Sequence, residues 1–214
     1  RIGAVIEGSR LNGYRTAAAD AVATDALARQ DASTLAMFGT GHQAEFEVAA
    51  VARVRSLERI LVVGRSQARA QAFAARLREQ GLECELSEPE AACRAADIIV
   101  TATTAQEPLF EADWVRPGTH VSSMGSDAAG KQELPPELFG RAALFCDLPE
   151  QARRIGEFQH APAGLELTAI GEVLAGRAAG RRSPDEVTIF DSSGVSIQDL
   201  YIAHEIIAAA GRDA

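Results

Sequence analysis

The stretch TLAMFGTGHQAEFEVAAVARV, residues 34–54, decides the fold of this chain. Its first residues form a short apolar run that is typical of a buried strand and stops at Gly39. A helical pattern follows. Between them lies G-T-G-H-Q-A, which has the form of a dinucleotide-binding turn with Ala44 at the third glycine position.

Each small residue of this turn has a physical role in such a site. Gly39 permits the tight turn, Gly41 lets the backbone approach a pyrophosphate, and Ala44 lets the helix pack closely on the sheet. The start of the helix offers free N–H groups and the positive end of its dipole. A purely structural turn is the alternative, with His42 as an exposed first-turn residue. We expect cofactor contacts from Gly39, Thr40, Gly41, His42 and Gln43.

Downstream of the turn, strand-like and helix-like segments alternate. The helical segments include residues 66–81 and 88–96. Strands that alternate with helices imply a parallel sheet with right-handed crossovers, and hence a Rossmann-type, doubly wound α/β fold. The strands are expected at 34–39, 59–64, 83–87, 97–103, 119–125 and 143–147.

The two ends of the chain have a different pattern. Residues 3–8, GAVIEG, predict a short strand-like piece, and an Ala-rich helix is expected to start near Thr16. After Asp147 the alternation loosens. We expect residues 31–147 to form the dinucleotide-binding domain, and residues 1–30 and 148–214 to be pieces of a second, smaller domain. In that last piece, helices are expected in 148–158, 167–176 and 197–211, and a strand in 187–194.

The composition argues against several classes of partner. The net charge is −9 and no cluster of Lys or Arg stands out, which argues against nucleic acid or an anionic membrane. No apolar run reaches the ~18 residues of a membrane span, and the start lacks a signal-peptide core. The three cysteines show no CxxC spacing, so we expect buried, reduced thiols and a cytoplasmic protein. The four histidines are scattered, so no metal site is expected.

The end of the second expected strand bears on the choice of cofactor. An NAD site usually has an acid there, about 20 residues after the glycines. This chain has Gly64-Arg65-Ser66 instead. Arg65 can hold a 2′-phosphate through charge-assisted bonds, and Ser66 can add a hydroxyl and cap the next helix. We therefore expect NADPH, with NADH or NAD less favoured; Arg65 as a plain surface cation is the alternative.

Six stretches of the sequence together indicate a protein family more specifically than the glycine turn does. In this order they resemble the ornithine cyclodeaminase and mu-crystallin family across nearly the whole chain. They are RLNGYRTAAADAVATDALA (10–28), FGTGHQAEFEVAA (38–50), AADIIVTATTAQEPLF (95–110), WVRPGTHVSSMGSDAAGKQEL (114–134), AIGEVLAGR (169–177) and TIFDSSGVSIQDLYIA (188–203).

The resemblance assigns roles to two charged residues. Arg15, in YRTAA, matches the arginine that holds the substrate carboxylate, a task that suits the fixed fork of a guanidinium. Asp127, in GSDAAGKQEL, matches the general acid/base of the cyclodeaminases. A surface ion pair for Arg15 and a turn-forming role for Asp127 are the structural alternatives. Lys131 and Glu133 are expected to be loop and helix-start residues.

The resemblance also implies polar contacts around the ribose and nicotinamide. Thr101 and Thr103 at the end of the fourth strand, Ser122 and Ser123 on the fifth, and Ser192 in FDSSG are expected there. Ordinary strand and turn hydroxyls are the alternative. Asp191 stands where the family more commonly has lysine, and the sequence alone does not say what this changes.

The implied function is NADPH-dependent reduction of a small cyclic ketimine, such as Δ1-pyrroline-2-carboxylate, to an L-amino acid. The alternatives are an NAD-dependent cyclodeaminase and a non-catalytic NADPH and small-ligand carrier like mu-crystallin. The acid at Asp127 favours an enzyme, since mu-crystallin does not keep one there. A homodimer is implied. Arg1 is not an initiator methionine, and the family has a further segment before RTAA that carries substrate-binding cations and dimer contacts; we expect a fragment or a processed form.

Overall fold

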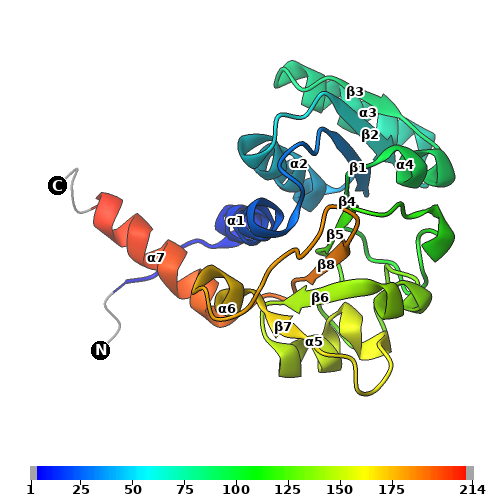
Figure 1. The fold of residues 1–214 in the computed structure, drawn as a ribbon. Coiled ribbons are helices and arrows are strands. Elements are labelled where there is room, and N and C mark those ends of the chain that lie inside the picture. The colour runs from blue at the N-terminus through cyan, green and yellow to red at the C-terminus, as the bar shows by residue number, and fades with distance from the viewer. Residues whose placement is uncertain (1–3, 211–214) are drawn as a thin grey trace.

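The computed structural model describes residues 4–210. Within them, eight parallel strands form one sheet in the order β3-β2-β1-β4-β5-β8-β6-β7 (Figure 1). The strands are β1 (Thr34–Phe38), β2 (Arg59–Val63), β3 (Cys84–Leu86), β4 (Ile98–Thr101), β5 (His120–Ser123), β6 (Ala142–Cys146), β7 (Thr168–Ala169) and β8 (Val187–Asp191). This confirms the doubly wound α/β fold.

Helices flank the sheet, which is why the strands are apolar on both faces. The α-helices are α1 (Ser9–Leu27), α2 (His42–Val54), α3 (Gln67–Glu79), α4 (Pro89–Ala95), α5 (Pro149–Ile155), α6 (Ile170–Leu174) and α7 (Ser196–Ala210). Short 3-10 helices are η1 (Ala112–Trp114), η2 (Pro136–Arg141) and η3 (Glu157–His160).

The alternation of side chains along β1 shows how the two cores are separated. Leu35 and Met37 pack in one core with buried residues of α1, α2 and α3. Ala36 and Phe38 pack in the other, with residues of α4, η2 and α5. Because successive residues of a strand point to opposite faces, one apolar strand serves both cores. All three cysteines are buried and unpaired, as the sequence predicts.

The topology creates a crevice at the carboxyl edge of the sheet. The chain runs from β1 outward to β2 and β3, and then returns to β4 on the other side of β1. The segments that follow β1 and β4 therefore leave the sheet in opposite directions. In open α/β sheets, ligands bind at this switch point. The glycine turn follows β1, so the fold places it at the edge of this crevice.

Most expected elements are confirmed, with two corrections near the ends of the chain. The piece expected as a strand at 3–8 is neither strand nor helix over residues 4–8, and Gly3 lies outside the described residues. Val5 is 91% exposed, so this piece has no sheet partner to stabilise it. The first helix starts at Ser9 rather than near Thr16, and it contains Gly13, where an added Cβ would lie 2.7 Å from the ring of Phe46.

A second correction concerns residues 167–176, where one helix was expected. The structure has the two-residue strand β7, which pairs with β6, followed by the five-residue helix α6. β8 then enters the sheet between β5 and β6, so two strands from beyond residue 147 complete it. The division into residues 1–30, 31–147 and 148–214 stays a prediction.

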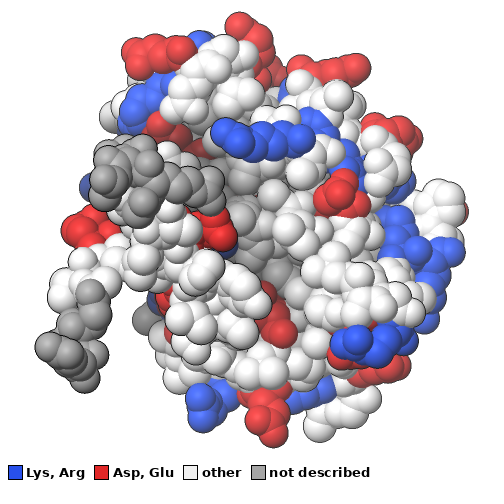
Figure 2. Space-filling view, turned by 90° about the vertical axis from the view of Figure 1, so that its left-hand side faces the viewer, with Lys and Arg blue, Asp and Glu red and all other residues white. Residues whose placement is uncertain are grey.

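The last helix lies apart from the sheet. In Figure 1, α7 extends away from the sheet on the side where both ends of the described chain lie. The segment 4–7 and the end of α7 form an apolar groove lined by Val5, Ile6, Tyr14 and Ile207, among others. Seen from this side, uncharged residues cover much of the middle of the molecule, and charged side chains gather toward its outline (Figure 2).

Candidate active site

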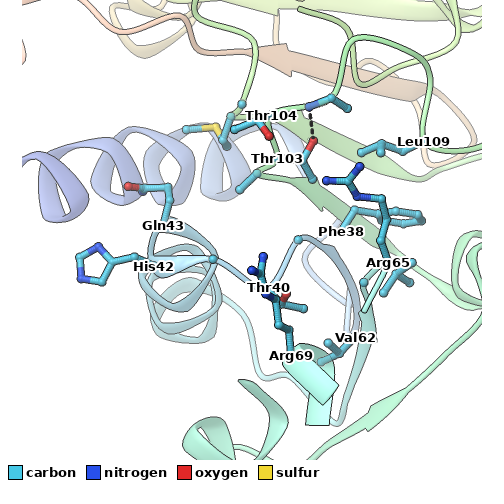
Figure 3. Close-up of a pocket in the computed structure, with 18 of the residues that line it drawn as sticks. Phe38, Thr40, His42, Gln43, Val62, Arg65, Arg69, Thr103, Thr104 and Leu109 are labelled. Carbon is cyan, nitrogen blue, oxygen red and sulfur yellow. Dashed lines mark hydrogen bonds between the residues drawn. The ribbon is translucent and has the colours of Figure 1, made fainter. Parts of the chain in front are cut away.

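A large cavity of about 1460 Å³ lies at the carboxyl edge of the sheet and runs past the ends of β1, β2 and β4. Figure 3 shows part of its lining, with Thr40, Arg65, Arg69 and Thr103 around the opening. Eleven of the fourteen site residues expected from the sequence line this cavity. They are Arg15, Gly39, Thr40, Gly41, His42, Gln43, Arg65, Ser66, Thr103, Asp127 and Ser192.

The glycine turn has the geometry that its sequence predicts. Gly39 has φ +123°, and a Cβ added to it would lie 2.5 Å from the carbonyl oxygen of Ala102. Only glycine tolerates both that backbone conformation and that close approach. At Gly41, by contrast, an added Cβ would meet nothing within 4 Å. The backbone of Gly41 therefore borders open space at the start of α2, where a pyrophosphate would fit.

The start of α2 is free to receive an anion. Gly41 is its N-cap residue, and no side chain caps the first N–H groups, which leaves donors and the positive helix end toward the cavity. The ring of His42 packs edge-on against Phe46 at a centroid distance of 4.8 Å and points away from the cavity centre (Figure 3). The side-chain amide of Gln43 donates to Glu47 and to the carbonyl of Gly13, so it is tied to the helices.

Two arginines stand at the end of β2, one on each side of the start of α3. Arg65 precedes the helix and Arg69 lies in its first turn; both side chains are exposed and line the cavity (Figure 3). The hydroxyl of Ser66 accepts a bond from the N–H of Arg69 at 3.4 Å, so Ser66 is the cap that the sequence predicts. Arg69 adds a cation that sequence reasoning missed, although its position one turn after Arg65 was a usable signal.

Basic side chains outnumber acidic ones in the lining of the cavity, although the chain as a whole has a net negative charge. Its described lining contains four basic side chains, Arg15, Arg65, Arg69 and Lys131, and two acidic ones, Glu88 and Asp127, in a chain of net charge −9. A concave site of the opposite sign to the molecule raises the local concentration of anionic ligands. This charge pattern suits a ligand that carries phosphates and a carboxylate.

Asp127 lies in the loop after β5, three strands across the sheet from β2, the strand that Arg65 follows. Its side chain is 60% exposed and forms an ion pair with Lys131, whose ammonium also donates to the carbonyl of Gly125 at 3.2 Å. The pair keeps the carboxylate at the cavity wall while leaving it accessible. Lys131 therefore has a contact with a candidate catalytic group, beyond the loop role expected for it.

Arg15 reaches the cavity from α1 and is held from three sides. Its Nε donates to Asp199 at 3.1 Å, its Nη1 to Gln198 at 3.1 Å, and its Nη2 to Asn12. An arginine has five N–H donors, so one N–H on each terminal nitrogen remains for a ligand. That pair of donors suits a carboxylate.

Thr101, Ser122 and Ser123 are the three expected site residues that do not line the cavity, and all three are completely buried. The hydroxyls of Thr101 and Ser123 donate to the carboxylate of Glu133, at 2.8 Å and 3.1 Å, and the hydroxyl of Ser122 lies 3.1 Å from Nε2 of His120. Thr101 and Ser123 are the last residues of β4 and β5, but their hydroxyls are directed to the buried carboxylate of Glu133 instead of the opening. The role expected for Glu133 as a helix-start residue is wrong, since it is completely buried and no helix begins there.

A second buried acid supports Glu133 from behind. Both carboxylate oxygens of Glu157 accept from the backbone N–H of Glu133, at 3.1 and 3.0 Å, and one accepts from Leu134 at 2.8 Å. Burial, together with the nearby carboxylate of Glu133, raises the pKa of Glu157 to about 7, although its hydrogen-bond donors oppose the rise. The hydroxyl oxygen of Ser123 lies 3.3 Å from Oε2 of Glu157 and 3.1 Å from Oε2 of Glu133, so this one hydroxyl lies between the two carboxylates.

The FDSSG loop is held by a third acid. The hydroxyl of Ser192 donates to Asp147 at 2.7 Å, and the N–H of Gly194 donates to the same carboxylate at 3.2 Å. Burial raises the pKa of Asp147, and these two donors oppose the rise. Asp191 points away from the cavity: it is completely buried against Gly156, and burial raises its pKa well above the usual range. It therefore does not contribute to the lining.

Comparison with known proteins agrees with this geometry. The chain matches the model of the ornithine cyclodeaminase/mu-crystallin family over residues 2–211. It is 39% identical to the iminosuccinate reductase of Paracoccus denitrificans, over 98% of this chain and 67% of that protein. The structure superposes with a TM-score of 0.91 on an archaeal alanine dehydrogenase dimer with bound NAD, at 33% identity, covering 97% of this chain and 67% of the other.

A further solved relative is the Δ1-pyrroline-2-carboxylate reductase of Thermococcus litoralis in complex with NADH and L-proline. The TM-score is 0.88 at 31% identity, covering 96% of this chain and 67% of that chain. The present chain spans about two thirds of its relatives, for example 64% of the alanine dehydrogenase of Archaeoglobus fulgidus. Because the family model covers almost every residue and the parallel sheet, glycine turn and cavity agree with it, the chain belongs to the ornithine cyclodeaminase/mu-crystallin family.

Proposed function

We propose that this chain forms the dinucleotide-binding part of an NADPH-dependent reductase that converts a small cyclic imino acid to an L-amino acid. One observation carries the proposal: the glycine turn, Arg15 and Asp127 line the same cavity. The turn provides a place for a pyrophosphate, Arg15 offers two free donors to a carboxylate, and Asp127 offers an exposed carboxylate to a nitrogen. Relatives named as imino-acid reductases support this substrate class.

The residues present fit a nicotinamide dinucleotide. The open space beside Gly41 and the uncapped start of α2 suit the pyrophosphate. Arg65, Arg69 and Ser66 suit the phosphate of NADPH at the adenosine ribose, where an acid would favour NAD instead. The similar alanine dehydrogenase, iminosuccinate reductase and pyrroline-carboxylate reductase structures contain NAD, NAD+ or NADH, so the preference for NADPH rests on the residues at the end of β2 alone.

The chain's own side chains would prepare the substrate. Arg15 holds the ring carboxylate, which fixes the imine carbon toward the end of the cavity near Gly125 and Asp127. When bound, the dinucleotide supplies a hydride to that carbon. Asp127 stabilises the protonated imine nitrogen, which makes the carbon a better hydride acceptor, and the rest of the contribution is positioning.

The direct test is a panel of cyclic imino acids of different ring size, assayed with NADPH and with NADH. We expect oxidation of NADPH with at least one five- or six-membered ring substrate and recovery of the matching L-amino acid. A full-length form should be assayed beside the present chain. Oxidation of the dinucleotide with none of the substrates, despite its binding, would reject the reductase.

The same panel separates the two rival functions. An ornithine cyclodeaminase would release ammonia from a diamino acid with NAD, which relatives named as cyclodeaminases make worth testing. A carrier would bind NADPH and a small ligand without turnover. The accessible Asp127 favours a reaction at this site over simple binding.

We also infer a homodimer and a cytoplasmic location. The similar alanine dehydrogenase is a dimer, and α7 exposes Ile197, Leu200 and Tyr201, each more than half exposed. Among the helices that the structure describes, none has the length and apolar character that crossing a bilayer requires. We propose that α1 and α7, at the two ends, belong to a second substrate and dimerisation unit, while β7 and β8 complete the main sheet.

A further inference from the structure

One buried carboxylate joins the ends of two neighbouring strands beneath the cavity. Oε1 of Glu133 accepts from the backbone N–H and the hydroxyl of Thr103, at 2.7 and 2.8 Å. Oε2 accepts from the hydroxyls of Thr101 and Ser123, at 2.8 and 3.1 Å, and from the N–H of Gly125 at 2.9 Å. Glu133 thus contacts the segments that follow β4 and β5 at the same time.

These two segments form one end of the cavity. Thr103 and Gly125 both line it, and they touch each other: a Cβ added to Gly125 would lie 2.3 Å from the carbonyl oxygen of Thr103 and 2.5 Å from Oε1 of Glu133. Asp127 follows two residues later. The carboxylate of Glu133 therefore sets the separation of the two backbones and the start of the loop that carries Asp127.

The charge of Glu133 is compatible with its burial. Five donors surround a group with about four lone-pair sites, so its ionised form is fully satisfied. Burial raises its pKa, while the hydroxyls of Thr101 and Thr103 and the backbone donors lower it. A neutral amide in the same place could offer only one acceptor oxygen, and its NH₂ group would face donors.

The position of Thr103 and Gly125 along the cavity indicates which half of the cofactor would lie beside them. Arg65 and Ser66, at the end of β2, mark the adenosine half of the proposed cofactor, and Gly41 marks the pyrophosphate. The remaining half must then cross β1 toward the ends of β4 and β5. We propose that Glu133 is a positioning residue for the nicotinamide half of the bound dinucleotide, acting through Thr103 and Gly125; this rests on the proposed function.

The test compares two ligands that differ only in the nicotinamide. NADPH and 2′-phospho-ADP-ribose, which lacks that ring, are titrated calorimetrically into the wild-type chain and Glu133→Gln. We expect Glu133→Gln to bind NADPH at least about tenfold more weakly, while the fragment binds within about twofold of wild type. Glu133→Asp, which keeps the charge, should recover part of the loss. Asp191→Asn, another completely buried acid, is the control and should change neither affinity.

Each other outcome has a distinct meaning. Equal weakening of both ligands, or no weakening of either, overturns the positioning role. The same holds if wild type binds the fragment as tightly as NADPH. If wild type binds neither ligand, the proposed function fails instead. Should Glu133→Gln not fold, Thr101→Val removes one of its donors without a buried charge change, at a completely buried residue outside the cavity lining, and the same difference between the two ligands must appear.

Discussion

Arg15 and Asp199 form an ion pair that links the first and last helices of the structure. Nε of Arg15, on α1, lies 3.1 Å from Oδ1 of Asp199, on α7, across 184 positions of sequence. The side chain of Arg15 is 18% exposed and that of Asp199 is 59% exposed. The acid is accessible to water, so it orients the guanidinium without neutralising it strongly.

The pair leads to a prediction about substrate affinity. An exposed ion pair contributes about 0.2–1 kcal/mol, so Asp199→Asn should raise the KM for the imino acid by no more than about fivefold. Arg15→Lys, which cannot provide the fork, should raise it far more. Steady-state assays with Glu90→Gln as a control will check this, since Glu90 pairs with Arg94 on α4. A loss for Asp199→Asn as large as that for Arg15→Lys would contradict this interpretation.

Replacement of Arg65 tests the choice of cofactor. A bond to a charged phosphate contributes roughly 1.5–3 kcal/mol, and exposure of Arg65 to solvent favours the lower end. Arg65→Ala should therefore bind NADPH about tenfold more weakly with little change for NADH. Arg76→Ala is a control, since Arg76 lies on α3, the helix that follows Arg65, and pairs with Glu45. Equal losses for the two cofactors would remove Arg65 from phosphate recognition.

Because the pKa of Glu157 is raised in the folded protein, we predict that the free energy of unfolding depends on pH. Its carboxyl has a pKa of about 7 in the folded protein, against an ordinary value of 4.5. Between these values the unfolded chain loses a proton that the folded chain keeps. The stabilisation is therefore complete below about pH 4.5 and is lost as the pH rises to about 7. At about 1.4 kcal/mol per pKa unit, the loss is at most about 3.5 kcal/mol.

Glu157→Gln should remove this dependence. Its amide stays neutral, so the variant should be more stable than wild type at pH 8 and similar at pH 4.5. Urea unfolding at pH 4.5, 6 and 8 measures this, with the exposed Glu150→Gln as control. Parallel pH curves for Glu157→Gln and wild type would show that Glu157 is not the titrating group. Glu133 and Asp191 are the other acids that face it, and they would then be examined.

Local patterns predicted most of the fold because each depends on neighbours in sequence. Short apolar runs, three of them ended by glycine, predicted the strands. Ser66 was identified as a cap from its place before a helical pattern. The order of the strands in the sheet could not be predicted in this way. No local pattern specifies that β8 enters between β5 and β6, because its own residues are equally apolar at any inner position of a parallel sheet.

The site was predicted where contacts are local and missed where they are distant. The turn around Gly39 carries its own signal in sequence. Glu133, in contrast, gains its role from Thr101, Thr103 and Ser123, which lie 10 to 32 positions before it and meet it only after β4 and β5 pair. For the same reason Thr101 and Ser123 were expected at the cavity, although their hydroxyls are directed to Glu133.

Asp127 carries the proposal of an enzyme, and its replacement is the decisive variant. Its carboxylate is 60% exposed at the cavity wall, and Lys131 holds it there without burying it. A positioned acid or base typically contributes ~10²–10⁴ in rate. Asp127→Asn keeps the shape and removes the charge that favours the protonated imine. We expect kcat to fall by at least about a hundredfold.

The affinity of the same variant for NADPH should stay within about twofold of wild type, because Asp127 follows β5, three strands across the sheet from the arginines at the end of β2. Glu88→Gln is the matched control: it is the other acid of the described lining, beside the end of β3, and should leave kcat unchanged. Stopped-flow measurement of the hydride-transfer step with saturating NADPH separates chemistry from binding. A wild-type kcat in Asp127→Asn on the best substrate would exclude Asp127 from the reaction and favour the ligand carrier.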